Sequence, residues 1–256
     1  MEAVAIDRTT LVTFLLRLAD DHLILGHRLS EWCGHAPMLE EDLAMPNIAL
    51  DLIGQARALY QHAAEVEGKG RSEDDLAYLR HERDYVNCLL VERQNGDFAQ
   101  TMLRQFCFAA FMHPLWTAME KGSDETLAAI AAKAVKECAY HIRHAGEWVI
   151  RLGDGTEESA RRMAAAVETL APYLDELFDG DDVTGAVAEA GIAPEPASVR
   201  AAFDRTVAQV FAEAMLDMPR AEWPQRGGRA GRHTEAMGHL LADLQYMQRT
   251  FPGAAW

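Results

Sequence analysis

One stretch of the sequence combines residue types that could hold a metal. Glu137, Tyr140, His141 and His144 follow one another within a few helical turns. In di-iron bundle enzymes, a Glu and a His three residues apart point to the metals from each of two helices, and each of the other two helices adds a Glu. Here Tyr140 stands three residues after Glu137, and His141 comes one place too late.

The rest of the chain does not supply that spacing either. None of the ten histidines has Asp or Glu three residues before it. The helix expected over residues 97–120 is apolar nearly all round and has no carboxylate between Asp97 and Glu120. The sequence is therefore built like a metal-binding bundle but lacks the ligands.

Three polar residues of a second expected helix share a face at a spacing of four. They are Asn47, Asp51 and Gln55. Gly54 follows Asp51 at the third place, so a carboxylate-histidine chelate cannot form there. We interpret the three residues as an inward polar ladder, and a hydrogen-bonded network or a solvated stripe explains them better than a metal does.

Charge pairing is expected where a metal would otherwise lie. Lys133 can reach Glu137, and Glu137 can reach His141, because each pair is four residues apart on one helix. A lysine beside a ligand carboxylate also opposes a divalent cation. We therefore predict that the chain holds no metal and that seven positions mark a lost site: Asn47, Asp51, Gln55, Lys133, Glu137, Tyr140 and His141.

Other polar groups favour no particular chemistry. The first helix carries acid and base types at Asp20, Asp21, His22, His27 and Glu31. These could act in acid-base catalysis, but a polar helix face explains them as well. The glycine-rich basic loop at residues 224–233 could cradle phosphates, contact the carboxylates of a partner or simply be solvated.

Composition favours a cytoplasmic all-α protein. Of the 256 residues, 49% are hydrophobic, and helix formers dominate. A net charge of -16 repels nucleic acid and anionic membranes. Charged residues interrupt the apolar run at 11–29, so it can neither span a bilayer nor act as a signal peptide. The four cysteines lack a Cys-x-x-Cys spacing and are expected to be buried thiols.

Apolar periodicity and capping patterns predict a single domain, residues 1–256, with four long core helices and about four peripheral ones. The expected helices cover residues 10–32, 39–67, 73–90, 97–120, 124–152, 157–178, 185–190, 198–218 and 234–250. Ser72 and Asp75 form a capping box for the third of these, and Ser123 is expected to cap the fifth.

Several segments together match a known pattern. They are residues 28–37 (RLSEWCGHAP), 50–57 (LDLIGQAR), 89–92 (LLVE), 133–137 (KAVKE) with 140–141 (YH), 233–235 (HTE) and 244–246 (LQY). This pattern closely resembles the C subunits (PaaC) of bacterial phenylacetyl-CoA epoxidases, over nearly the whole chain. The resemblance implies a ferritin-like fold and a non-catalytic structural subunit in aerobic phenylacetate breakdown.

The resemblance also implies partners. In this family a related catalytic A subunit holds the di-iron centre and most of the substrate, a B subunit bridges assemblies and a reductase supplies electrons from NADPH. Two stretches of the C subunit lie near the CoA part of the substrate, and they correspond here to Asp84, Tyr85, Val86 and Asn87 and to Gly185, Ala186 and Val187. The second stretch departs from the family pattern, which is bulkier at position 185. Packing against the A subunit is the alternative for both stretches.

Two rival functions fit the sequence less well. One is an independently active ferritin-like oxygenase or oxidase with an atypical site built from Glu137, His141, His144 and Asp51. The other is a generic helical binding module, which predicts no selective association with the A subunit.

Overall fold

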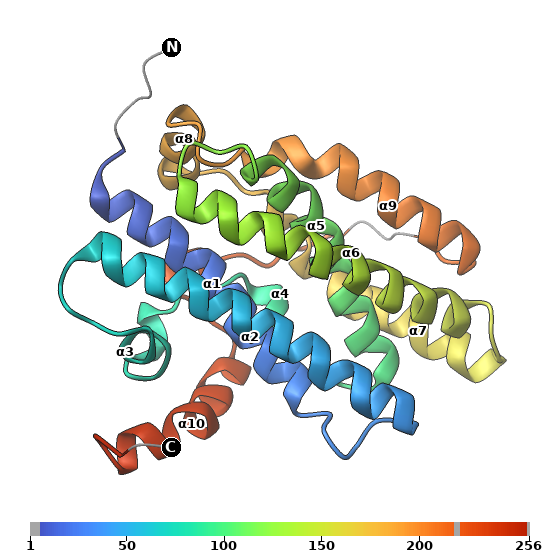
Figure 1. Cartoon of the computed structure of the whole chain (residues 1–256). Coiled ribbons are helices and arrows are strands. Elements are labelled where there is room, and N and C mark those ends of the chain that lie inside the picture. The colour runs from blue at the N-terminus through green and yellow to red at the C-terminus, as the bar shows by residue number, and fades with distance from the viewer. Residues whose placement is uncertain (1–5, 218–220, 255–256) are drawn as a thin grey trace. The chain divides into compact units, whose positions relative to one another are not determined.

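The computed structural model describes residues 6–217 and 221–254, and within these ranges every regular element is a helix (Figure 1). The α-helices are α1 (Arg8–Ser30), α2 (Leu39–Glu67), α3 (Glu73–Tyr78), α4 (Leu89–Glu92), α5 (Phe98–Met119), α6 (Glu125–Gly153), α7 (Glu157–Leu170), α8 (Asp182–Glu189), α9 (Arg200–Glu213) and α10 (Glu235–Thr250). Short 3₁₀ turns are η1 (Glu82–Asp84), η2 (Ala171–Tyr173), η3 (Asp175–Phe178), η4 (Pro196–Val199) and η5 (Gly228–Ala230). The all-α prediction is confirmed.

The helices group into two compact units, each centred on an antiparallel pair of long helices (Figure 1). Among the described residues, 7–94 and 226–254 form the unit that contains α1 packed on α2, with α3, α4 and α10. Residues 95–217 belong to the unit that contains α5 packed on α6, with α7, α8 and α9. These four long helices are those of the ferritin-like fold class, whereas the single-domain organisation stays a prediction.

Helix α2 begins and ends where the sequence predicted. Gly68 follows its last residue in the left-handed region, at φ 67°, and its N–H donates to Ala64 O. Glycine adopts this conformation without steric cost, and it therefore stops the helix. Pro46 lies inside the helix without ending it.

The helix predicted over residues 73–90 is wrong. Its capping box between Ser72 and Asp75 is confirmed, but α3 ends at Tyr78, and the chain runs extended from Tyr85 to Cys88. The backbone N–H groups of Val86 and Cys88 donate to carboxylates of α1 (2.8 and 2.7 Å). Because these amides bind side chains of a distant helix, they cannot form a helical ladder.

Other boundaries also differ from prediction. Asp124 caps α6 through Leu127 N (2.8 Å), whereas the Ser123 hydroxyl donates to Ala190 O. The sixth predicted helix ends at Leu170 and continues as 3₁₀ turns, since proline at 172 interrupts the helical hydrogen bonds. The helix predicted over residues 198–218 begins as the 3₁₀ turn η4, and α9 ends at Glu213, so both predicted bounds are wrong; residue 218 itself lies outside the described residues.

Helix α5 is buried on all sides, as its composition predicted. Every residue from 101 to 112 is buried. Three cysteines are buried as expected, but Cys33 is exposed, which corrects the prediction for that thiol. No helix of the described residues is long and apolar enough to cross a membrane.

Candidate functional site

The predicted metal-site positions on α6 divide between its two faces. Its buried face carries His141, which is 2% exposed. Lys133 pairs with Glu137 at 3.1 Å as predicted, but the Lys133 side chain is 71% exposed. Lys136 and Tyr140 are also exposed. The interpretation that these lysines fill an interior space is therefore wrong, because the rotation of α6 directs them outward.

The polar ladder of α2 runs from the surface into the core. Asn47 is exposed and its amide donates to Leu43 O (2.8 Å), Asp51 is half-buried, and Gln55 is buried. Each step of four residues rotates the side-chain direction by about 40° around the helix axis. Three residues at this spacing therefore do not all point to the same side. An amide that donates to its own helix and a carboxylate at the rim do not form a ligand set.

The residues present do not fit a di-iron centre. A di-iron centre in a helical bundle needs four carboxylates and two histidines that converge. Within the described ranges, no group of three or more His, Cys, Asp or Glu side chains lies close enough to hold a metal ion. The interpretation of the seven positions as a lost metal site stays a prediction. Of these positions, only Gln55 and His141 are buried.

The structure does contain a converging polar site that sequence reasoning missed, in the unit of α1 and α2. Its first part is centred on Asp20, which is completely buried. Arg80 forms an ion pair with this carboxylate, and the Tyr60 hydroxyl donates to it at 2.5 Å. The Arg80 guanidinium lies 4.1 Å from the centre of the Tyr85 ring, a cation-π contact.

The second part pairs Asp21 of α1 with Arg229 of η5. The Arg229 Nη2 atom lies 2.7 Å from Asp21 Oδ2, and its Nη1 donates to Val86 O at 3.0 Å. Burial raises the pKa of Asp21, and the Arg229 charge opposes that shift. Arg229 therefore holds the extended segment against α1. Asp20, Asp21 and the fully buried His22 are not a solvated face of the first helix, which corrects that interpretation.

The third part joins Glu92 of α4 to the start of α10. His233 Nδ1 lies 2.7 Å from Glu92 Oε2 and its Nε2 lies 2.9 Å from Tyr85 O, so both ring nitrogens face acceptors and the protonated ring can donate to both. Burial alone lowers the pKa of His233, but the bond to Glu92 and its charge raise it overall. Thr234 N and the Asn87 amide also donate to Glu92.

The basic loop is thus largely an internal clamp. Two of its basic residues bind carboxylates of the same unit: Arg229 binds Asp21, and His233 binds Glu92. Gly228 allows the close approach, since a Cβ there would lie 2.2 Å from Asn87 O. The alternatives of a phosphate cradle or a partner contact do not describe these two residues.

The network fixes the first predicted CoA-contact stretch. The side chains of Tyr85 and Asn87 are completely buried. Asp84 is exposed and Val86 is half-buried. Next to this stretch, η1 and α10 border a groove of about 390 Å³, lined by His81, Glu82, Gly238, Leu241, Ala242, Gln245, Tyr246, Arg249 and Thr250. The buried pair has a structural role, and Asp84 and Val86 are the accessible part.

The second predicted stretch belongs to the other unit. Gly185, Ala186 and Val187 lie in α8, which Asp181 caps through Val183 N and Thr184 N. Val187 is 1% exposed, whereas Gly185 and Ala186 are half-buried. A contact with a ligand through this stretch is therefore limited to the small residues at 185 and 186.

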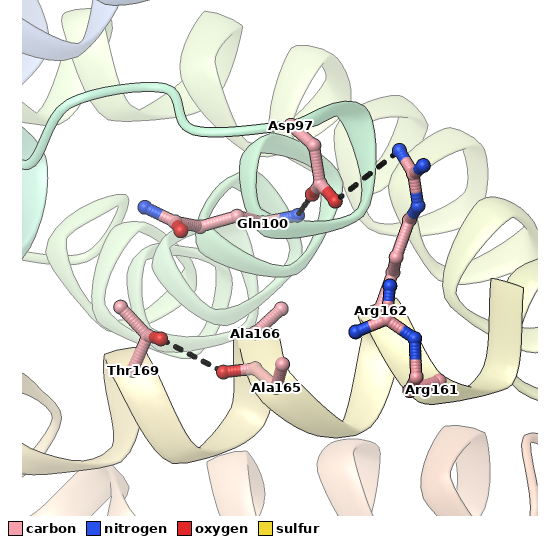
Figure 2. Close-up of a pocket in the computed structure, with 7 residues that line it drawn as sticks. All are labelled: Asp97, Gln100, Arg161, Arg162, Ala165, Ala166 and Thr169. Atoms are coloured by element: carbon pink, nitrogen blue, oxygen red, sulfur yellow. Dashed lines mark hydrogen bonds and ion pairs between the residues drawn. The ribbon is translucent and has the colours of Figure 1, made fainter. Parts of the chain in front are cut away.

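A pocket of about 270 Å³ beside the start of α5 is charge-balanced from within (Figure 2). Figure 2 shows its lining residues, Asp97, Gln100, Arg161, Arg162, Ala165, Ala166 and Thr169. Arg161 and Arg162 both bind Glu158, at 2.9 and 2.7 Å, and Arg162 lies 3.9 Å from Asp97. Carboxylates of the same unit therefore neutralise both arginines, and the pocket does not have the excess positive charge of an anion site.

Two comparisons with known proteins add to this geometry. Residues 2–256 match a family model described as "Phenylacetic acid catabolic protein". A curated relative, the C subunit of 1,2-phenylacetyl-CoA epoxidase from Escherichia coli (strain K12), is 47% identical over 246 residues, which cover 96% of this chain and 99% of the relative. The similarity therefore extends over both units.

Proposed function

Because the chain belongs to the family of phenylacetic acid catabolic proteins, we propose that it is a structural, non-catalytic C subunit of a phenylacetyl-CoA epoxidase complex. In this proposal it contributes no cofactor of its own. A homologous A subunit supplies the di-iron chemistry that epoxidises the aromatic ring, and a B subunit and an NADPH-dependent reductase complete the complex.

The exposure and the bonding partners of the expected metal-ligand positions are the main support for this proposal. On α6, Lys133 and Tyr140 face solvent and Glu137 is committed to Lys133. On α2, Asn47 is an amide bonded to its own helix. The three carboxylates that do converge, Asp20, Asp21 and Glu92, are each paired with an arginine or a histidine of the same unit, so in this proposal they stabilise the fold and do not act as metal ligands.

We further propose that the segment clamped by this network contributes to CoA binding in the complex. Asp84 and Val86 offer accessible groups on a backbone held from two sides, and the neighbouring groove has room for part of a ligand. Such a rigid support lowers the entropy lost on binding. Gly185 and Ala186 of α8 are the accessible part of the second stretch.

Co-expression of this chain with the A subunit tests the proposed function. We expect a stable complex and phenylacetyl-CoA epoxidation that depends on both chains and the reductase. Glu137→Gln in this chain should leave the turnover of that complex unchanged, since Glu137 pairs with Lys133 of its own helix and is not a metal ligand in this proposal. Failure of the two chains to co-purify, or loss of turnover with Glu137→Gln, would contradict the proposal.

A further inference from the structure

A small pocket opens between α1, α2 and α3, within the unit that these helices belong to. Its volume is about 80 Å³. Sites for small molecules commonly measure about 300–1,000 Å³, so this pocket has room for one side chain and not for a whole cofactor. We call it the tyrosine socket, and its walls are formed by Leu23, Ile53, Ala56, Tyr60, Ala77 and Tyr78.

The walls of the tyrosine socket suit a methylene chain that ends in a cation. The four aliphatic residues are buried or half-buried, so an apolar stem in the socket is shielded from water. The Tyr60 hydroxyl donates to Asp20 at 2.5 Å, which leaves the ring of Tyr60 to line the socket. Tyr78 adds a second ring, and the faces of such rings attract cations. Both the stem and the charge therefore find a matching surface.

The rim of the tyrosine socket is negatively charged. Arg57, the basic residue of the lining, already pairs with Glu73 at 3.2 Å, and Gln61 also donates to Glu73. Asp74 is exposed at the rim, and among the described residues no cation pairs with its carboxylate. Burial and the charge of Asp74 both raise the pKa of Tyr78, so this carboxylate lies close enough to act on the socket. One negative charge at the rim is thus left uncompensated.

We propose that the tyrosine socket receives a lysine or arginine side chain from another subunit of the complex, with its stem against the walls and its charged head beside Asp74. The net charge of -16 favours the same occupant, because it draws basic surfaces toward the chain. A carboxylate or a phosphate is repelled by Asp74, and a neutral side chain leaves the rim charge unused. The partner's being a subunit rests on the proposed function, whereas the chemistry of the socket does not.

Titration with probes of similar shape and different charge tests that chemistry. n-Butylammonium reproduces a lysine side chain, 1-butanol lacks the charge, and butyrate reverses it. Followed by the methyl resonance of Ile53 in the full chain, n-butylammonium should have a dissociation constant about two- to fivefold below that of 1-butanol, as an exposed ion pair provides. Butyrate should bind weakest. Asp74→Asn should remove the difference between the first two probes.

Two further variants complete the probe experiment. Glu125→Gln is the matched control for Asp74→Asn, because Glu125 is also an exposed carboxylate in the first turn of a helix, and it lies outside the socket. Ala77→Leu fills the socket and should weaken all three probes, with far-UV circular dichroism as the check of folding. Equal dissociation constants for n-butylammonium and 1-butanol, tighter binding of butyrate, or no shift of Ile53 with any probe would overturn the proposal.

The assembled complex tests the source of the side chain. Asp74→Lys should weaken the binding of this chain to the subunit that fills the socket by more than about tenfold, since it sets like charges against each other, whereas Glu125→Lys should not. Tyr78 should become protected from iodination, mapped by mass spectrometry, when the complex forms. A complex with Tyr78 still reactive and no effect of Asp74→Lys would overturn the proposal. Absence of any complex would instead contradict the proposed function, and the probe titration would still decide the chemistry of the socket.

Discussion

Replacement of Arg229 by methionine tests whether the basic loop is an internal clamp. Arg229 pairs with Asp21, whose side chain is 0% exposed, and the Arg229 side chain itself is 22% exposed. Removal of one member of a buried ion pair costs about 3–5 kcal/mol, because it leaves a buried charge unpaired. Since solvent reaches Arg229, we expect the lower end of that range, about 3 kcal/mol.

Thermal and urea unfolding followed by far-UV circular dichroism measure that cost. For a chain of this length, about 1 kcal/mol shifts Tm by about 2–4 °C, so Arg229→Met should lower Tm by about 6–12 °C. Arg232→Met is the control in the same loop; Arg232 is exposed, and its loss should change stability by less than about 0.5 kcal/mol.

A double-mutant cycle separates the pair from general packing. In an Asp21→Asn background, Arg229→Met should cost at least about 1 kcal/mol less than in the natural chain, because no carboxylate is left unpaired. Equal losses from Arg229→Met and Arg232→Met, or the same loss in both backgrounds, would refute the clamp.

Three further predictions concern the same network. The pKa of His233 is raised in the folded state, so the stability gained from its protonation is complete below about pH 6.5 and is lost as the pH rises through the folded-state pKa. The Tm difference between the natural chain and His233→Gln should therefore shrink from about pH 6 to about pH 9. Gly228→Ala should destabilise the fold by about 1 kcal/mol or more in urea unfolding, because its Cβ would collide with Asn87 O. Asp84→Asn, which keeps an acceptor for His81 N, should raise the KM for phenylacetyl-CoA in the reconstituted complex with little change in Tm. Tyr85→Phe, which loses buried bonds to Ala77 O and Gln245, should instead lower Tm by several degrees.

The long helices could be predicted because their signals are local. The bounds of α2 follow from apolar spacing and from the left-handed turn at Gly68. The extended segment at 85–88 could not be predicted, because it depends on two carboxylates more than sixty residues earlier that take up its amides. Paired acids at Asp20 and Asp21 within an apolar helix do indicate buried charges that need cationic partners.

The sequence does not identify those partners. Arg80 and Arg229 bind neighbouring residues of α1, yet they lie far apart along the chain. The site on α6 failed for a different reason. Spacing tells which residues share a face, but only packing decides which face is buried, and in α6 it is the face of Ala134, Cys138 and His141 rather than that of Lys133.

The iron content of this chain, purified alone after iron loading, tests the central claim most directly. A structural subunit without converging ligands should retain well under one iron per chain, and its complex with the A subunit should gain about two iron atoms per pair. Two tightly held iron atoms per isolated chain would contradict the account and favour an independent oxygenase.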